Sequence, residues 1–571
     1  MNRFVLCLVA ALAGTAPVVP AAGQELAAGL AVSPVVIAPP ATPLAATIKA
    51  GLSAAYYSAA RDTAAYREAQ DLYFFYGARH FEPIWLDQGS DGEVAFSASA
   101  QRIMRLFGEA AELGLDPADY LTPELDLAPS GADPASLAAL ETRFSAAVMR
   151  YATHLYTGRL DPRKVNPLLD IAPKALDETA LLMELASSDE PEKVLAALEP
   201  THPQYLALKK ALAAFDESGA NRPPQLAEGP TLRSGMSDPR VPTLRTRLEL
   251  PASDSLVYDD TLVEAVKAFQ IAHALDVDGA VGPATRSALN GGLPVTRADI
   301  LANMERWRWM PRDLGEFHVF VNIPEFRLRI NRDGVEEYTT RVVVGTVKNQ
   351  TPIFSDNIRH VVVNPYWNVP SSIIRGEVAP AVLRNPAYLD SQNMDLLYNG
   401  TPVSPWQVNW SMVSTSNFPF RVRQRPGPGN ALGQIKFLFP NKHDVYLHDT
   451  PSKSLFARDL RAFSHGCVRV ENPMEFADAL MANEPTISRA SLEAMFGPSE
   501  RWVNPTRQIP VHLAYFTVKV TDDGELVSFG DVYGHNAAVI EAMGLGTLPE
   551  LAPEIIAAAE PVPAAANTLS P

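Results

Sequence analysis

The sequence predicts a multidomain α+β protein, and three changes of pattern along the chain support that prediction. Residues 51–230 are rich in Ala, Leu and Glu, a composition that favours a helical scaffold domain. Residues 231–293 combine helical spacing with turn signals, as expected of a small helical unit of its own. Residues 294–535 change after Trp309 to strand-like segments, which predict a β-rich, sandwich-like domain. A chain of 571 residues has room for roughly three or four domains.

The two ends of the chain have the compositions of a targeting segment and a tail. Arg3, the apolar run 4–12 and the small residues 21–23 form the pattern of a signal peptide over residues 1–23. No later stretch approaches the ~20 apolar residues of a membrane span. We therefore expect an exported, periplasmic protein with no transmembrane segment in its mature chain. An Ala/Pro-rich linker is expected at 24–50, and a disordered tail at 536–571.

The chain is acidic, which bounds its partners. Its formal charge is −17, and removal of residues 1–23 takes away only Arg3 and leaves −18. Such acidity argues against nucleic acid or anionic lipid as the main partner.

The module at 231–293 has a recognisable pattern. Leu262, Ala265, Val266 and Phe269 follow helical spacing, and a turn and a Pro-initiated helix follow at 276–289. This pattern resembles the peptidoglycan-binding domain of cell-wall enzymes, a three-helix module. The matching segments are 241–248, 265–270 and 278–282, with Thr285 and Leu289. The resemblance implies descent from a binding module, while glycan binding by this chain and a helical subdomain without a ligand both stay open.

The β-rich domain is predicted strand by strand. Residues 318–330 and 335–345 form a hairpin around the turn Asp333-Gly334. Further strands are expected at 359–364, 434–439, 444–448, 511–521 and 525–532. Between about 366 and 432 the pattern breaks into Pro, Asn and Ser, with a helical piece at 373–383. An insertion of this length is typical of a functional cap.

One cysteine, Cys467, remains after the predicted signal peptide with Cys7 is removed. It lies in the hexapeptide 464–469, Ser-His-Gly-Cys-Val-Arg. A lone thiol in an exported chain is a buried bystander, an intermolecular linker or a nucleophile. The neighbouring Ser, His, Gly and Arg favour the nucleophile.

A thiol with a pKa near ~8.5 needs a base at neutral pH. His448 and His465 are both candidates, and sequence spacing does not choose between them. The backbone amides of Gly466 and Cys467 are candidate oxyanion donors. Arg469 shares a strand face with Cys467 and offers a planar fork for a substrate carboxylate.

These residues also have other interpretations. His443, His448, His465 and Cys467 match no common zinc-site spacing, which argues against a metal centre. Arg469 has a second interpretation, a structural ion pair with Glu471 or Glu475. Among the aromatic side chains, Tyr366, Trp367 and Trp406 fit core packing and a substrate wall equally well, while Trp307 and Trp309 are expected in the core.

The residues around the cysteine resemble a known catalytic motif. His448-Asp449-Thr450-Pro451, followed by the hexapeptide 464–469 with fifteen residues between His448 and Ser464, resembles the motif of YkuD-type L,D-transpeptidases. The segments 364–370 and 462–464 resemble the large periplasmic members of this family. Those members carry a scaffold, a peptidoglycan-binding domain and a capped catalytic domain, in the order expected here.

The resemblance implies a role for each residue of the motif. Cys467 is the acylated nucleophile, His448 is its general base and acid, and His465-Gly466-Cys467 supply backbone oxyanion donors. Arg469 binds or orients the carboxylate of the donor peptide. The third partner of His448 is usually a backbone carbonyl in this family, and the Asp449 side chain is an alternative. Further expected substrate-side residues are Ser464, which more readily bonds within its own loop, Tyr366, Trp367 and Tyr446.

The resemblance also implies a function. We expect an enzyme of cell-wall biogenesis and cell shape that forms 3→3 crosslinks between peptidoglycan stem tetrapeptides, needs no cofactor and is acylated by carbapenems. Hydrolysis of the same peptides, attachment of a lipoprotein to the wall, and a catalytically silent wall-binding scaffold are the alternatives. The sequence does not give the acceptor, the protein partners, the motion of the cap or the oligomeric state.

Overall fold

The computed structural model describes residues 37–546, except for 90–92, 126–128, 216–223, 273–274, 276, 291–294, 483 and 485–486. The predicted signal peptide, most of the predicted linker and the tail beyond 546 lie outside the described residues. The chain separates into two compact units. The first comprises the chain up to Ala111 with Leu115–Tyr156 and Ala175–Glu199, and the second comprises Glu112–Gly114, Thr157–Lys174 and everything from Pro200 onward.

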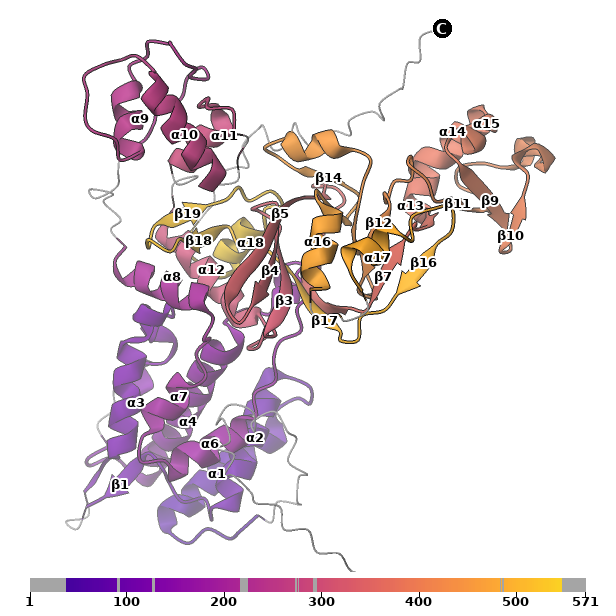
Figure 1. Ribbon diagram of the computed structural model, residues 1–571. Helices are drawn as coiled ribbons and strands as arrows, with labels where there is room; N and C mark the ends of the chain where they lie inside the picture. Colours follow the sequence, from indigo (N-terminus) through magenta and orange to yellow (C-terminus); the bar gives the residue numbers. More distant parts are fainter. Residues whose placement is uncertain are drawn as a thin grey trace, which may run out of the picture. The chain divides into compact units, whose positions relative to one another are not determined.

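The first unit is helical, as its composition predicts (Figure 1). Its helices are α1 (Pro43–Ser58), α2 (Ala64–Ala78), α3 (Ala98–Gly108), α4 (Pro134–Thr157), α6 (Glu178–Ser187) and α7 (Pro191–Ala196), with a hairpin of β1 (Leu86–Gln88) and β2 (Val94–Phe96). Helix α1 begins inside the segment expected to be a linker. It starts there because the Thr42 side chain accepts a hydrogen bond from the Ala45 amide and Pro43 suits the first helical position.

The predicted scaffold segment, 51–230, does not form one unit. Residues 157–174, which include α5 (Pro162–Val165), belong to the second unit, where Leu169 pairs with Ile353 in a parallel bridge. Helix α8 (Pro203–Ala213) packs there against α12 (Arg297–Trp309). The composition of these segments matches the rest of the scaffold, so composition alone does not reveal the division.

The three-helix module contains α9 (Val241–Arg247), α10 (Asp260–Ala272) and α11 (Pro283–Leu289). The buried Gln270 of α10 holds the turn that precedes α11, because the Gly279 amide in that turn donates to Gln270 Oε1 at 2.9 Å. The apolar core of the module consists of Leu226, Leu232, Val241, Leu244, Tyr258, Leu262, Val266, Val281 and Leu289.

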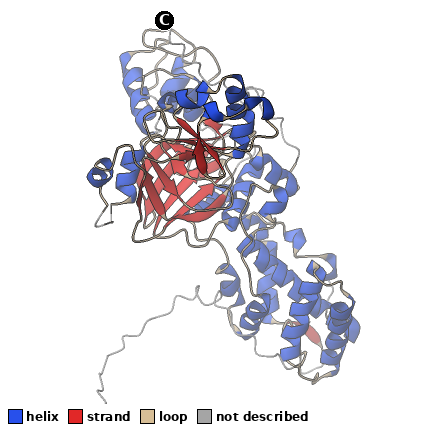
Figure 2. Ribbon diagram, turned by 90° about the vertical axis from the view of Figure 1, so that its right-hand side faces the viewer, coloured by secondary structure: helices blue, strands red, loops and turns tan. Residues whose placement is uncertain are grey.

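The β-rich domain is built on one curled sheet of eleven strands (Figure 2). The strand order is β16-β7-β12-β13-β15-β5-β4-β3-β17-β6, and β14 pairs with β5. Their bounds are β3 (Phe317–Asn322), β4 (Arg327–Arg332), β5 (Val335–Gly345), β6 (Phe354–Ile358), β7 (His360–Val363), β12 (Ile435–Leu438), β13 (Leu447–His448), β14 (Ala462–Ser464), β15 (Val468–Val470), β16 (Arg501–Val503) and β17 (Ile509–Ala514). The shared core also contains Trp307 and Trp309, which confirms their expected burial.

Two predicted strands are broken in the structure. Residues 318–330 form β3 and β4, joined by a turn at 323–326 that contains Pro324. Residues 511–521 are divided between β17 and β18 (Val518–Val520), which pairs with β19 (Leu526–Ser528). The turn Asp333-Gly334 is confirmed, because both residues have positive φ and Arg332 pairs with Val335.

Further helices accompany this sheet, in addition to α12. Helices α16 (Pro473–Leu480) and α17 (Arg489–Glu493) follow β15. Helix α18 (His535–Ala542) occupies the start of the segment expected to be a disordered tail, and it is ordered because Val539 and Ile540 pack into the core. None of the helices in the described part of the chain is long and apolar enough to cross a membrane.

The predicted insertion forms a cap with its own apolar core. It contains β8 (Trp367–Asn368), α13 (Ser371–Ile373), the π-helix η5 (Ile374–Val378), α14 (Ala379–Arg384), α15 (Ala387–Ser391), β9 (Met394–Tyr398), β10 (Thr401–Val403) and β11 (Arg421–Gln424). Its four strands form a separate sheet, β10-β9-β11-β8. The Val369 amide bonds to the Val422 carbonyl at 3.0 Å, so the chain enters and leaves the cap side by side.

Candidate active site

Strand register places the predicted site residues on one face of the sheet. Lys436 on β12 pairs with His448 on β13, and His448 pairs with Arg469 on β15. Their strand neighbours Phe437, Leu447 and Val468 point the other way, into the apolar core. Because side chains alternate along a strand, Lys436, His448 and Arg469 project together from the opposite face.

Cys467 ends the loop between β14 and β15. It precedes Arg469 by two residues, which puts both side chains on the same face. The Val468 amide bonds to the Tyr446 carbonyl at 3.1 Å, so Cys467 and Tyr446 stand beside each other as His448 and Arg469 do. The Cys467 thiol donates to the Asp444 carbonyl at 3.7 Å, and the rings of Tyr446 and His448 lie 5.7 Å apart.

The loop before Cys467 depends on Gly466, whose φ is +115°, a conformation that side chains disfavour. Thr351 Oγ1 donates to the Gly466 carbonyl at 2.8 Å, and Ser464 Oγ donates to the Cys467 carbonyl at 2.5 Å. The Gly466 amide donates to Ser464 Oγ at 3.1 Å, so this amide is already satisfied inside the loop. Among the described residues, the Cys467 amide makes no hydrogen bond and is therefore free to donate to a ligand.

His448 is oriented by a backbone carbonyl. Its Nδ1 bonds to the Asp449 carbonyl at 2.5 Å, and because a carbonyl only accepts, Nδ1 carries the proton. The lone pair of Nε2 is therefore available to accept a proton. Burial, together with the positive charges of Arg469 and Lys436, lowers the pKa of His448 to about 3, so the imidazole is neutral throughout the neutral range.

The Asp449 carboxylate does not serve as the third partner. It accepts hydrogen bonds from the Thr450 amide at 2.7 Å, the Gln434 amide at 2.9 Å and Lys453 Nζ at 2.8 Å. Gly433, with φ +60°, makes room for it, because a Cβ there would collide with the carboxylate. Asp449 thus uses its carboxylate to fix the local backbone and its carbonyl to orient His448.

The thiol is neutral in the unliganded site. Burial raises the pKa of Cys467 to about 11, although hydrogen bonding to Tyr446 and the charge of Arg469 act in the opposite direction. A neutral thiol and a neutral imidazole on the same sheet face, rather than a preformed ion pair, are the resting state that these pKa values describe. Proton transfer to His448 then belongs to the step in which the sulfur attacks.

Arg469 has no acidic partner among the described residues, and the two partners expected for a structural ion pair are engaged elsewhere. Glu471 is paired with Arg341 at 2.6 Å, and Glu475 is paired with Arg489 at 3.3 Å. Sequence reasoning missed Lys436, which occupies the same face and is only 8% exposed. A charged residue between the apolar Ile435 and Phe437 is the signal that points to it.

The other histidines of the motif point elsewhere. His465 Nε2 contacts Glu377 of η5 in the cap at 3.0 Å, and this bond lowers the pKa of Glu377. His443 Nε2 contacts Asp170 at 2.8 Å. No three His, Cys, Asp or Glu side chains in the described ranges are placed to hold a metal ion.

The predicted aromatic residues lie in and around the cap. The Arg423 guanidinium stands 4.2 Å from the ring centre of Tyr366, and Trp367 packs against the cap core. Trp406 is 67% exposed and is therefore not a core residue.

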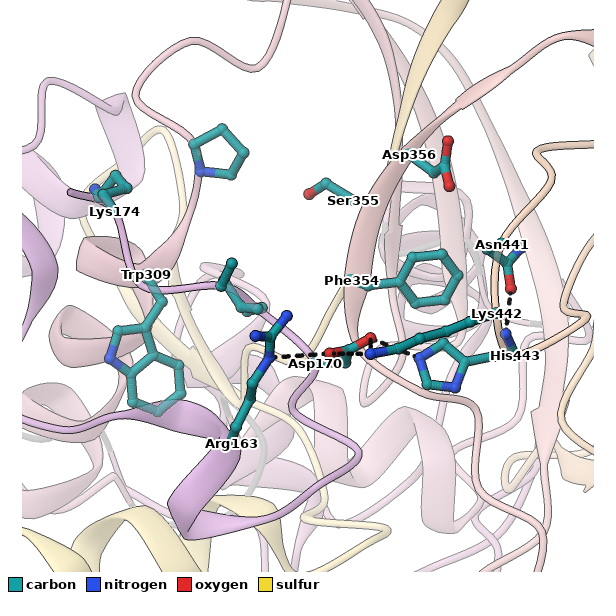
Figure 3. A pocket seen from close by; sticks show the side chains of 13 residues that line it. Arg163, Asp170, Lys174, Trp309, Phe354, Ser355, Asp356, Asn441, Lys442 and His443 are labelled. Atoms are coloured by element: carbon teal, nitrogen blue, oxygen red, sulfur yellow. Dashed lines mark hydrogen bonds and ion pairs between the residues drawn. The ribbon is translucent and has the colours of Figure 1, made fainter. Parts of the chain in front are cut away.

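A cavity of about 500 Å³ lies beside the turn that precedes Tyr446. In Figure 3, Asp170 lies among Arg163, Lys442 and His443. The three distances from its carboxylate are 3.0, 2.8 and 2.8 Å. Burial alone would raise the pKa of Asp170, but Lys442 and His443 hold it below its usual value. This cluster anchors the turn whose Asp444 carbonyl accepts the Cys467 thiol.

Three family models match the chain. The model described as "L,D-transpeptidase catalytic domain" matches residues 316–487, the model "Scaffold domain" matches 70–212, and the model "Putative peptidoglycan binding domain" matches 242–289. A curated protein of Haemophilus influenzae, named "Putative L,D-transpeptidase", is 36% identical over 241 residues. The aligned region covers 42% of this chain and 48% of that protein, so the chain spans about half the length of this relative.

Solved structures show more distant likenesses. An L,D-transpeptidase from Xylanimonas cellulosilytica is 17% identical, with a TM-score of 0.17, over 50% of this chain and 99% of that one. An L,D-transpeptidase from Stackebrandtia nassauensis is 12% identical, with a TM-score of 0.22, over 51% and 96% of the two chains. Neither likeness is close enough to support a conclusion about this chain.

Proposed function

Because residues 316–487 are an L,D-transpeptidase catalytic domain in a chain that also carries a scaffold and a peptidoglycan-binding domain, we propose that this protein forms 3→3 crosslinks between peptidoglycan stem peptides. The observation that supports a thiol mechanism is the shared sheet face of Cys467 and His448, with His448 Nδ1 bonded to the Asp449 carbonyl. The proposed substrates are a donor and an acceptor stem tetrapeptide.

The first half-reaction acylates the enzyme. Cys467 Sγ attacks the carbonyl at the L-centre of diaminopimelate, stem residue 3, while His448 Nε2 takes the thiol proton. The Cys467 amide donates to the oxyanion that forms. Collapse breaks the peptide bond, the imidazolium passes its proton to the leaving D-Ala amine, and a thioester remains on Cys467.

The second half-reaction forms the crosslink. The side-chain amine of diaminopimelate on the acceptor stem attacks the thioester carbonyl, and His448 Nε2 removes a proton from that amine. The C–S bond breaks, an amide forms, and the proton returns to the sulfur. Arg469, which is paired with no carboxylate in the described ranges, orients a carboxylate of the donor. The cap, which reaches the hexapeptide 464–469 through the Glu377–His465 contact, limits access of water to the thioester.

The proposed place of action is the periplasm, in line with the signal-peptide pattern of residues 1–23. We expect carbapenems to acylate Cys467, since they present a strained amide to the same nucleophile.

The test uses purified tetrapeptide muropeptides and the full mature chain. Wild-type protein should convert them to 3→3 linked dimers with release of D-Ala, and the variants Cys467→Ala and His448→Ala should not. Monomeric tripeptide without dimer would replace the crosslinking proposal with hydrolysis. Unchanged crosslinking by Cys467→Ala would reject the thiol mechanism, and a mass shift of wild type with meropenem, absent in that variant, would support it.

A further inference from the structure

Two basic side chains on the active-site face make no ion pair within the described part of the chain. Within the part of the chain that the structure describes, neither the Lys436 ammonium nor the Arg469 guanidinium makes a hydrogen bond or an ion pair. Lys436 is 8% exposed, and Arg469 Nε is fully covered without a partner. The only contact of the Lys436 charge in the described residues is with the ring of Tyr446, whose centre lies 5.9 Å away.

The Lys436 side chain is largely covered, but its Nζ stays open to solvent, so an anion can reach it. A charge-assisted hydrogen bond to such an anion is stronger than one between neutral groups. Burial lowers the pKa of Lys436, while the charges of Glu500 and Cys467 raise it. Glu500 makes no ion pair with Lys436 in the described residues, and its carboxylate instead accepts the Tyr366 amide at 2.9 Å and Trp502 Nε1 at 3.0 Å. The arrangement leaves Lys436 available for an anion that arrives with a ligand.

The strand register gives the position of the Lys436 ammonium relative to His448 and Cys467. Lys436 and Arg469 lie on the two strands that flank His448, so the proton acceptor has a cation on either side. Adjacent strands are ~4.8 Å apart, which separates the two backbones by ~10 Å. That spacing suits a ligand that carries more than one carboxylate, or one carboxylate and an oxyanion, around the bond that reacts at Cys467.

We propose that Lys436 is a specificity-determining residue that binds a carboxylate of the acyl-donor peptide, on the side of His448 opposite Arg469. The identity of the donor as a stem tetrapeptide rests on the proposed function. A tetrapeptide offers two sources of this carboxylate: the terminal D-Ala, next to the bond that breaks, and the side chain of diaminopimelate. Lys436 recognises the carboxylate in either case, and selectively amidated donors identify the source.

Binding is measured without turnover, on full-length mature protein that carries Cys467→Ser. Titration calorimetry with the tetrapeptide compares this parent with versions that also carry Lys436→Met or Lys436→Arg. A version with Lys348→Met, which removes an exposed lysine of the same domain, controls for the loss of one charge. Loss of a charge-assisted hydrogen bond corresponds to ~10–100-fold in Kd.

We expect Lys436→Met to weaken binding by about that factor, Lys436→Arg to retain most of the affinity, and Lys348→Met to bind like the parent. A donor amidated at the relevant carboxylate should bind the parent and Lys436→Met equally. The proposal would be overturned if the parent and Lys436→Met bound the unmodified donor equally. It would also be overturned if Lys436→Met bound every amidated donor more weakly than the parent by the same factor, because that result would indicate a structural defect. If the parent bound the tetrapeptide tightly but wild-type protein did not convert it, the proposed function would be rejected, and the proposal that Lys436 binds a carboxylate would stand.

A second readout separates binding from thiol activation. In protein that keeps Cys467, the substitution Lys436→Met should slow alkylation of Cys467 by iodoacetamide, relative to wild type, by much less than the ~10–100-fold loss of donor affinity. A loss of alkylation as large as the loss of donor affinity would show that Lys436 acts on the sulfur and would contradict a role in substrate binding.

Discussion

At the scale of single residues, the site depends on the protonation states of His448 and Cys467 and on the hydrogen bond that orients the imidazole. His448 is a neutral imidazole whose tautomer is set by the Asp449 carbonyl, and Cys467 is a neutral thiol. Sequence reasoning narrowed the base to two histidines but could not decide between them. The choice depends on register and on the side chain of His465, which contacts Glu377 in a distant segment.

The neutral resting thiol predicts the pH dependence of Cys467 alkylation. A thiol alkylates as the thiolate, and below its pKa the thiolate fraction rises tenfold per pH unit. With a pKa of about 11, the rate with iodoacetamide should still be rising at pH 9.5. Cys467→Ala provides the blank. A plateau reached below pH 8 would instead indicate a thiolate–imidazolium pair in the free enzyme.

The close contact between Gly433 and the Asp449 carboxylate leads to a second prediction for a single residue. Alanine there would strain a backbone with positive φ and displace the Asp449 carboxylate, and with it the carbonyl that orients His448. Gly433→Ala should lower the free energy of unfolding by about 1–3 kcal/mol and slow donor acylation by roughly tenfold.

Gly429→Ala is the matched control for that substitution, because no atom lies within 4 Å of its added Cβ and Gly429 is not among the positive-φ glycines. Denaturant unfolding and single-turnover kinetics compare the two. Equal behaviour of the two variants would show that the Gly433–Asp449 contact does not matter for catalysis.

At the scale of elements, strand segments and the cap insertion could be predicted, but their exact extents could not. Alternation and turn residues located the strands around Asp333-Gly334 and 434–439, because those signals are local. The break between β3 and β4, with Pro324 in its turn, and the pairing of Leu169 with Ile353 depend on contacts far apart in the sequence. The same holds for Lys436, whose role emerges from its register with His448.

The Asp170 cluster, which anchors the turn before Tyr446, leads to a further prediction. Asp170→Asn keeps the shape but removes the charge that holds Arg163, Lys442 and His443. Because Arg163 and Lys442 are largely exposed, the loss of stability should be modest, about 1 kcal/mol. The turn at 441–446 should exchange its amide protons faster, and donor acylation should slow.

Asp356→Asn, in the same cavity, is the control, since Asp356 pairs only with the partly exposed Arg359 at 3.5 Å among the described cations. Hydrogen exchange at 441–446 that is unchanged by Asp170→Asn would contradict the role given to this anchor.

At the scale of the whole molecule, the two units have buried titratable groups of opposite kinds. In the first unit, burial raises the pKa values of Glu141 and Glu178 to about 7. In the second, burial lowers the pKa of His448 to about 3 and those of His202, His512 and His535 to about 4. Composition predicts neither set, since burial depends on the final packing.

These shifts predict opposite pH dependence of stability. A raised carboxyl pKa stabilises the first unit below pH 4.5, and this stability is lost as the pH rises toward 7. Lowered histidine pKa values stabilise the second unit above pH 6.5, and this stability is lost as the pH falls toward 4. Calorimetry between pH 4.5 and 6.5 should show two transitions that move in opposite directions by several degrees, and movement in the same direction would contradict the assignment.

The central claim is that Cys467 carries the donor acyl group, and trapping that intermediate tests it most directly. Wild-type protein is mixed with a tetrapeptide donor whose diaminopimelate side-chain amine is acetylated, so that no acceptor amine is present. The reaction is quenched in acid within the first turnover, and the protein is digested and analysed by mass spectrometry. The account predicts a tripeptide thioester on the peptide that contains Cys467, with one D-Ala released per acylated enzyme and neither product in Cys467→Ala. Release of D-Ala by Cys467→Ala at the wild-type rate, or an acyl group on any other residue, would contradict it.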